Sequence, residues 1–267
     1  MTQISILGCG WLGLPLAKAL IKKGFWVKGS TTSEEKLSVL EAAGIEPYIV
    51  QLSEQKTSES SADFLAQSEI LIVNIPPKLR GNSTENFVSK IGNLIPIIEK
   101  STVKKVIFVS STSVYGEDNE LVTEDTPLNP DTEGGRQLAV VENLLRKNTH
   151  FDTTILRFGG LIGEDRNPVR FLSGQENIEN PDAPINLIHQ ADCIGSIEQI
   201  IALNSWNKTF NAVAPFHPSR KEYYTQKATD MNLALPKFAS ANNNIGKTIC
   251  SDKLIQELNY CFLKPNL

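Results

Sequence analysis

A run of glycines near the N-terminus has the spacing of a phosphate-binding turn. The residues GCGWLG (8–13) follow the apolar run QISILG (3–8) and precede the helical pattern LPLAKALIKKG (14–24). In that context the first glycine permits a tight turn, the second lets the backbone approach a pyrophosphate, and the third lets the helix pack against the strand. Free N–H groups at the helix start would bind the phosphates. A glycine turn without a ligand is the alternative, but the context favours a dinucleotide bound by Gly8, Gly10, Trp11, Leu12 and Gly13.

The end of the second expected strand bears on the kind of dinucleotide. An NAD site usually carries a carboxylate there, which holds the ribose 2′-hydroxyl, but KGSTTS (28–33) has no acid. Hydroxyl groups in this segment could donate to a 2′-phosphate and Lys36 could reach it, although no arginine is present to pair with it. Glu34 and Glu35 are expected to favour the start of the following helix. We therefore expect NADP or NAD as the cofactor, with a slight preference for NADP, near Ser30, Thr31, Thr32 and Ser33.

Another candidate segment, VNIPP (73–77), ends the fourth expected strand. The carboxyl ends of parallel strands open toward the ligand in folds of this kind, so Asn74 and Pro76 are expected to line the cofactor site. A rigid turn is a sufficient alternative for Pro76 and Pro77.

The elements that must position these residues alternate along the first 160 residues. Apolar runs followed by helical patterns predict βαβ units, a parallel sheet and a doubly wound α/β fold. Gly24 and Gly44 are expected to stop the first two helices, Ser33 to cap the second, and Pro96 to bend or break a later one. The expected strands are 3–8, 25–29, 47–52, 70–76, 105–111 and 153–158, and the expected helices are 14–24, 33–44, 83–100 and 135–148.

The pattern loosens after residue 160. Strands are expected at 185–189 and 209–214, and helices at 190–203, 219–232 and 251–258. We therefore expect a dinucleotide-binding domain over 1–160 and a smaller substrate-side region over 161–267, interleaved with the core. The short stretch 160–184 leaves room for a small lid only, which favours a small-molecule ligand less bulky than a sugar nucleotide.

Composition and charge exclude several classes of protein. The net charge is −4 and the basic residues are scattered, so no surface for nucleic acid is indicated. No apolar run reaches the roughly 18 residues that span a membrane, and no signal-peptide pattern opens the chain. The 4 cysteines show no CxxC pattern and the 3 histidines are isolated, so we expect no metal site and a cytoplasmic protein with free thiols.

Five further motifs follow the glycines in order along the chain. They are SSTSVYG (110–116), LRFGGLIGEDRNP (156–168), INLIHQADCIGSIEQII (185–201), FNAVAP (210–215) and KTICSDKLIQELNYCF (247–262). With the glycine motif, they resemble the extended short-chain dehydrogenase/reductase family, which includes nucleotide-sugar epimerases and dehydratases. The resemblance covers nearly the whole chain and is nearest to short, atypical, epimerase-like bacterial proteins. It implies a Rossmann fold and NAD(P)-dependent chemistry.

The resemblance also implies a mechanism. In the family, a hydroxyl on the fifth strand and a Tyr-x-x-x-Lys pair on the next helix act on the substrate oxygen. The lysine lowers the pKa of the tyrosine and holds the nicotinamide ribose, while the tyrosine exchanges a proton as hydride moves. The family hydroxyl corresponds to Ser111 of this sequence.

The helix motif departs from the family at its acid/base pair. The family reads approximately Y-G-x-S-K-x-x-x-E, whereas residues 134–142 read GGRQLAVVE. Gly135 and Glu142 match, but Gly134 stands at the tyrosine position and Leu138 at the lysine position. Two other pairs have the same spacing, but both fall on segments that match other parts of the family; they are Tyr223 with Lys227 and Tyr260 with Lys264.

Three residues remain as catalytic candidates: Ser111, Tyr115 and Arg136. Tyr115 is the phenol nearest the expected site, with a packed ring as its alternative role. Arg136 could bind a carboxylate or phosphate, with a solvated helix-start arginine as the alternative. Outside this group, Asp192 is expected to cap a helix and His189 to be packed at a strand end.

Three hypotheses follow from this sequence. The first is an NAD(P)-dependent epimerase/dehydratase-like oxidoreductase with a non-standard acid/base set. The second is an NAD(P)-binding sensor or regulator without turnover, because loss of a positioned acid/base typically costs roughly 10²–10⁴-fold in rate. The third is a scaffold without a ligand. The resemblance also implies a homodimer formed through the helices at 83–100 and 135–148, with no nucleic-acid or membrane partner expected.

Overall fold

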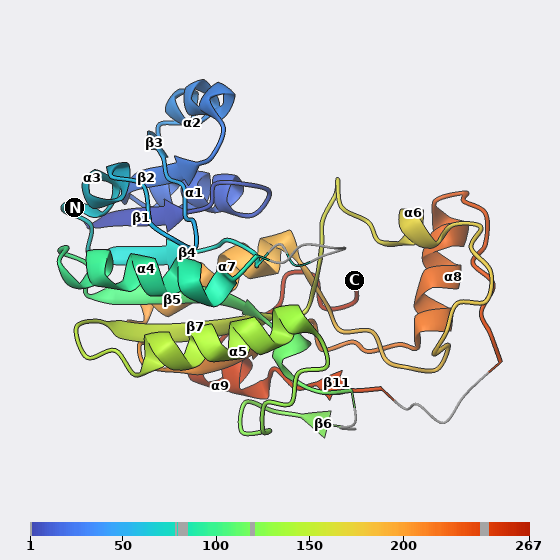
Figure 1. The fold of residues 1–267 in the computed structure, drawn as a ribbon. Coiled ribbons are helices and arrows are strands. Elements are labelled where there is room, and N and C mark those ends of the chain that lie inside the picture. The colour runs from blue at the N-terminus through green and yellow to red at the C-terminus, as the bar shows by residue number, and fades with distance from the viewer. Residues whose placement is uncertain (1, 78, 80–84, 118–120, 241–245) are drawn as a thin grey trace.

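The computed structural model describes residues 2–77, 79, 85–117, 121–240 and 246–267. Its centre is a seven-stranded parallel sheet in the order β10-β7-β5-β4-β1-β2-β3 (Figure 1). These strands are β1 (Gln3–Leu7), β2 (Trp26–Thr31), β3 (Glu46–Ile49), β4 (Ile70–Val73), β5 (Lys105–Ser111), β7 (Asp152–Phe158) and β10 (Thr209–Ala212). The strand order reverses beside β1, so the predicted doubly wound Rossmann fold is confirmed.

Helices cover both faces of this sheet because side chains alternate across each strand. Ile4 and Ile6 of β1 face one apolar cluster, whereas Leu7 belongs to the other. The first cluster is covered by α1 (Gly13–Lys22), α2 (Leu37–Ala42), α7 (Gln190–Ala202) and α9 (Asp252–Leu258). The second is covered by α3 (Ser60–Leu65), α4 (Phe87–Glu99) and α5 (Glu133–Arg146), of which α4 and α5 lie side by side in Figure 1.

The second half of the chain contributes to two regions. Its β10, α7 and α9 complete the central sheet and its covering layer. The elements α6 and α8 form the smaller lobe in Figure 1, held by a separate apolar cluster, whereas Ile249 of β11 packs in the second cluster of the core. Further elements are α6 (Val169–Leu172), α8 (Arg220–Asp230) and two short parallel pairs, β8 (Gly160–Ile162) with β9 (Leu187–His189) and β6 (Leu121–Val122) with β11 (Thr248–Ile249).

Pro96 does not break its helix, and Ser33 does not cap one through its side chain, so these two local expectations are corrected. Helix α4 continues through Pro96 to Glu99, because the proline lies on the exposed side, where water can bond the carbonyl that its missing N–H leaves free. The helix expected at 33–44 begins instead as a 3₁₀ turn, η1 (Glu34–Lys36), and the Ser33 side chain makes no capping hydrogen bond. No helix in the described ranges is long and apolar enough to cross a membrane.

Candidate cofactor site

The glycine motif forms the turn between β1 and α1, and its three glycines have different surroundings. A Cβ on Gly13 would lie 2.2 Å from the Gly8 carbonyl oxygen, and one on Gly8 would lie 2.6 Å from the Asn74 carbonyl oxygen. Gly8 also has a φ of +102°, which other residues rarely adopt. By contrast, no atom of the described residues lies within 4 Å of a Cβ on Gly10. Gly8 and Gly13 therefore hold the turn together, while Gly10 faces open space.

Backbone amides at the start of α1 have no hydrogen-bond acceptor among the described residues. Ser30 binds the turn from β2, since its Oγ accepts from the Gly8 amide at 2.9 Å and its carbonyl accepts from the Cys9 amide at 2.8 Å. In the described part of the chain, no acceptor meets the amides of Gly10, Trp11 or Leu12, and no side chain caps the helix. Unpaired amides at a helix start bind anions, especially phosphates. The residues present therefore fit the pyrophosphate of a dinucleotide.

Asn74 braces this turn from the end of β4. Its Nδ2 donates to the Gly8 carbonyl oxygen at 3.1 Å, and its own amide donates to the Leu7 carbonyl at 2.9 Å. Pro76 is exposed two residues further on. The structure thus brings Asn74 to the glycine turn, where it acts on the backbone of the turn.

The hydroxyl residues after Lys28 are spread over different environments. Ser30 and Thr31 lie inside β2, which extends two residues beyond the expected end, and both are buried. Thr31 Oγ1 accepts from the Ser33 amide at 3.1 Å, whereas Thr32 is exposed. The first acids that follow this strand in the sequence, Glu34 and Glu35, lie in the exposed η1 turn.

Ser111 ends β5 beside the start of α5. Its Oγ accepts from the Ser113 amide at 3.1 Å, which leaves its hydroxyl proton available to a ligand. The backbone carbonyl of Ser113 lies only 2.2 Å from where a Cβ on Gly135 would stand, so the backbone of α5 approaches this segment closely at Gly135. Among the described residues, the nearest atom to a Cβ on Gly134 would be Pro77 Cγ, at 3.9 Å, which is ordinary van der Waals contact. Leu138, one turn further on, is buried in the apolar cluster.

Tyr115 is fully buried, and both functions of its hydroxyl are used. The phenol donates to Asn211 Oδ1 at 2.8 Å and accepts from the Arg157 guanidinium. Burial raises the pKa of Tyr115, although Arg157 opposes the shift. These contacts place the Tyr115 hydroxyl inside the molecule and away from the open side of the glycine turn.

Arg157 and Glu142 form the ion pair at the centre of this buried network. Arg157 Nη2 lies 2.6 Å from Glu142 Oε2, and both side chains are 2% exposed. Glu142 also accepts from Ser110 Oγ at 2.6 Å, so the pair joins α5 to β5 and β7. Glu142 was matched to the family in the sequence, but Arg157 was not among the predicted residues. The signal that could have found Arg157 is the "LR" that begins the 156–168 motif.

Arg136 lies on the exposed first turn of α5. Its Nε is 2.9 Å from Glu133 Oε2, and its Nη1 donates to the carbonyls of Pro130 and Asp131. Thr132 caps the helix by accepting from the Gly135 amide at 3.1 Å. The guanidinium is therefore occupied by its own helix start.

Asp192 does not cap α7, contrary to expectation. The cap is His189, whose Nδ1 accepts from the Ala191 amide at 3.1 Å. The fully buried Asp192 carboxylate instead accepts from Tyr260 Oη at 2.9 Å and from the amides of Leu263 and Lys264 at 2.6 and 3.0 Å. Asp192 thus holds the segment after α9 against α7.

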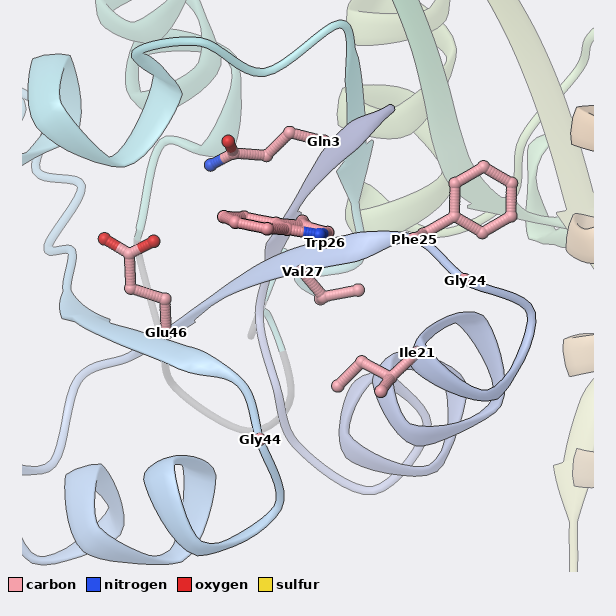
Figure 2. A pocket seen from close by; sticks show the side chains of 8 residues that line it. All are labelled: Gln3, Ile21, Gly24, Phe25, Trp26, Val27, Gly44 and Glu46. Atoms are coloured by element: carbon pink, nitrogen blue, oxygen red, sulfur yellow. The ribbon is translucent and has the colours of Figure 1, made fainter. Parts of the chain in front are cut away.

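A shallow hollow of about 360 Å³ lies at the other end of the sheet (Figure 2). Gln3, Trp26 and Glu46 begin β1, β2 and β3, so the hollow faces the amino ends of the strands. The glycine turn follows the carboxyl end of β1, and the hollow is separate from it. Its lining residues are Gln3, Ile21, Gly24, Phe25, Trp26, Val27, Gly44 and Glu46. Across the described residues, no group of His, Cys, Asp and Glu could hold a metal ion.

Comparison with known proteins agrees with this geometry. The sequence profile of the NAD(P)H-binding family matches residues 8–192. Protein YeeZ of Escherichia coli K12 is 32% identical over 268 residues, which cover 100% of this chain and 97% of the relative. UDP-glucose 4-epimerase of Dictyostelium discoideum is 34% identical over 85 residues, which cover 27% of this chain and 25% of the epimerase.

Solved structures share the fold. A Methylobacillus flagellatus protein, provisionally named an NAD-dependent epimerase/dehydratase, has a TM-score of 0.79 and 26% identity over 99% of this chain and 94% of its own. UDP-glucuronic acid 4-epimerase from Bacillus cereus, solved with NAD, has a TM-score of 0.80 and 18% identity over 98% of this chain and 94% of its own. The profile match over more than half of the chain and the full-length likeness to YeeZ show that the chain belongs to the NAD(P)H-binding family.

Proposed function

We propose that this protein binds NAD(P) with its pyrophosphate on the amides of Gly10, Trp11 and Leu12. The observation that carries the proposal is the combination of unpaired amides at the start of α1 with open space in front of Gly10. The Ser30 and Asn74 hydrogen bonds support it, because they keep the turn in one conformation before a ligand arrives.

We further propose a slight preference for NADP. The end of β2 has no carboxylate that would repel a 2′-phosphate or hold a 2′-hydroxyl. Thr32 is exposed next to Ser33 and could donate to the phosphate, and Lys36 is exposed one turn later. Parallel titrations of NAD, NADH, NADP and NADPH test this; a tighter Kd for NAD would contradict it.

The chemistry proposed for the bound state is that of an epimerase/dehydratase-like oxidoreductase with a non-standard acid/base set. NAD(P) supplies a hydride donor or acceptor. The Ser111 hydroxyl is the candidate donor to a substrate oxygen, because no described residue accepts its proton. Arg136 would bind a substrate anion only by leaving Glu133, and Tyr115 would reach a ligand only by leaving Asn211. The proposed substrate is a small molecule, less bulky than a sugar nucleotide.

A second candidate function is an NAD(P)-binding sensor or regulator without turnover. The observation that favours it is that the Tyr115 hydroxyl is buried and fully bonded, while Gly134 and Leu138 carry no acid or base. Such a sensor must bind oxidised and reduced cofactor with different affinity, since equal affinities shift no equilibrium.

Turnover by the wild type separates the two functions, and a Gly134→Tyr, Leu138→Lys double variant, expected to gain reductase activity if the site is otherwise intact, tests the missing acid/base pair. A Cβ at Gly134 would meet no described atom closer than 3.9 Å, whereas lysine at buried position 138 will lower stability, so Gly134→Tyr alone is the folding control. Hydride exchange with a panel of ketones and sugar nucleotides is measured on wild type and variants. Turnover by the wild type supports the oxidoreductase. Cofactor binding without turnover, together with a difference in Kd between NAD(P) and NAD(P)H, supports the sensor.

A further inference from the structure

We infer that Arg166, from the turn after β8, is a cofactor-binding residue that contacts the pyrophosphate of NAD(P) beside the amides of the glycine turn. The inference rests on the proposed function and adds a residue from the second half of the chain to it. The turn 163–166 is closed by two backbone hydrogen bonds of 3.0 Å between Gly163 and Arg166.

The side chain of Trp11 holds this turn against the glycine motif. Its indole Nε1 donates to Asp165 Oδ1 at 2.7 Å, although the two residues are 154 positions apart. Gly163 lies against the same ring, since a Cβ there would be 2.7 Å from an indole carbon. Gln190 Nε2 donates to the Trp11 carbonyl at 2.7 Å from the start of α7. Trp11 therefore has its amide at the proposed phosphate site and its ring and carbonyl in contact with the second half of the chain.

The Arg166 guanidinium lies over this ring, 5.1 Å from its centroid. Stacking on an indole orients a guanidinium without using its N–H donors. Among the described residues, the Arg166 guanidinium makes no hydrogen bond or ion pair. Arg166 is also exposed, so its donors are open to a ligand.

The neighbouring acids do not neutralise Arg166 directly. Asp165 accepts the indole N–H, and the Glu164 side chain is 93% exposed, 3.9 Å from His189 Nε2. The Arg166 guanidinium stacks on Trp11, whose backbone amide is at the proposed phosphate site. A guanidinium pairs with a diphosphate through parallel hydrogen bonds. The cofactor would thereby be bound from both halves of the chain.

The test is a set of binding titrations on the full-length protein with NADP, NAD, ADP and adenosine. Arg166→Gln keeps the stacked shape without the charge and is expected to weaken NADP, NAD and ADP by a similar factor, roughly tenfold. Adenosine has no phosphate, and its affinity should not change. The wild-type affinity for ADP should also fall more steeply with salt than that of the variant.

Arg170→Gln is the matched control, because Arg170 is an exposed arginine on α6 in the same segment. It should leave all four affinities unchanged, and thermal unfolding should show that both variants are folded. Wild-type binding that Arg166→Gln leaves unchanged would overturn this inference alone. A loss confined to NADP would also overturn it, because that result would place Arg166 at the 2′-phosphate. Absence of binding by the wild type would instead contradict the proposed function.

Discussion

Gly10 and Gly13 are two glycines of one motif with different physical roles. Gly13 is needed because the Gly8 carbonyl stands where its Cβ would be, whereas the space before Gly10 is open. We expect that Gly10 can be substituted without damage to the fold, because no described residue would contact a Cβ there.

We expect Gly10→Ala to retain the stability of the wild type and to weaken NAD(P) binding about tenfold or more, since the added methyl group would enter the space of the pyrophosphate. Gly13→Ala should instead destabilise the fold by roughly 1–3 kcal/mol through overpacking. Thermal unfolding and cofactor titration of both variants check this. Unchanged affinity in a folded Gly10→Ala protein would place the cofactor elsewhere.

Cys9, between the first two glycines, should be an unreactive thiol. Burial raises the pKa of Cys9 to about 12, so at pH 8 only about one molecule in 10,000 holds it as the reactive thiolate. Because the raised pKa keeps the thiol neutral, the reactivity of Cys9 should appear only as the pH rises toward 12. Timed alkylation with peptide mapping should label the exposed Cys261 first at pH 8. Early labelling of Cys9 in folded protein would contradict the packing of the turn.

Helix α5 is fixed to the sheet by a buried ion pair that no local pattern requires. Glu142 on the helix and Arg157 on β7 are joined through 3 hydrogen bonds of 2.6–3.2 Å, and Ser110 of β5 adds a further one. Because Ser111 is the next residue of β5, this pair also sets the position of the candidate hydroxyl relative to Gly134.

Glu142→Gln should lower the free energy of unfolding by roughly 3–5 kcal/mol, because it leaves the Arg157 charge buried without its partner. Chemical denaturation monitored by tryptophan fluorescence measures the change. Glu133→Gln is the control: it breaks the exposed pair with Arg136 on the same helix and should not move the unfolding midpoint. Equal losses of unfolding free energy in the two variants would show that the buried Glu142–Arg157 pair stabilises the fold no more than the exposed Glu133–Arg136 pair.

The two halves of the chain share one core. Strand β10 pairs with β7, and α7 and α9 cover the face of the sheet that α1 also covers. A division at residue 160 would leave β7 as an unpaired edge and expose the apolar side chains of that face, including Ile6, Leu16 and Leu156.

We therefore expect the fragment 1–160 to lack a stable tertiary structure when expressed alone. The physical reason is that its apolar face and its edge strand have no covering segment in the fragment. Circular dichroism in the near ultraviolet and dye binding to exposed apolar surface should show this, with the full-length chain as reference. Cooperative unfolding of the fragment would show instead that 1–160 is an independent domain.

Much of the fold could be predicted because its signals are local. Strand β1, the glycines and α1 are consecutive, so their spacing alone predicts the turn and the phosphate-binding helix start. The ends of elements were less predictable. The side chain of Ser33 does not cap a helix, since a 3₁₀ turn follows it. Pro96 does not end α4, since it lies on the exposed side of that helix.

The sequence by itself determined the doubly wound fold, the family and the glycine turn, all of which depend on residue type and short spacing. Only the tertiary structure decided which polar groups are available to a ligand. The Tyr115 hydroxyl is hydrogen-bonded to Asn211, 96 positions away, and the Asp192 carboxylate to the amide of Leu263, 71 positions away. Partners so distant in the chain leave no periodic pattern, and their contact exists only once the sheet and its covering helices have packed.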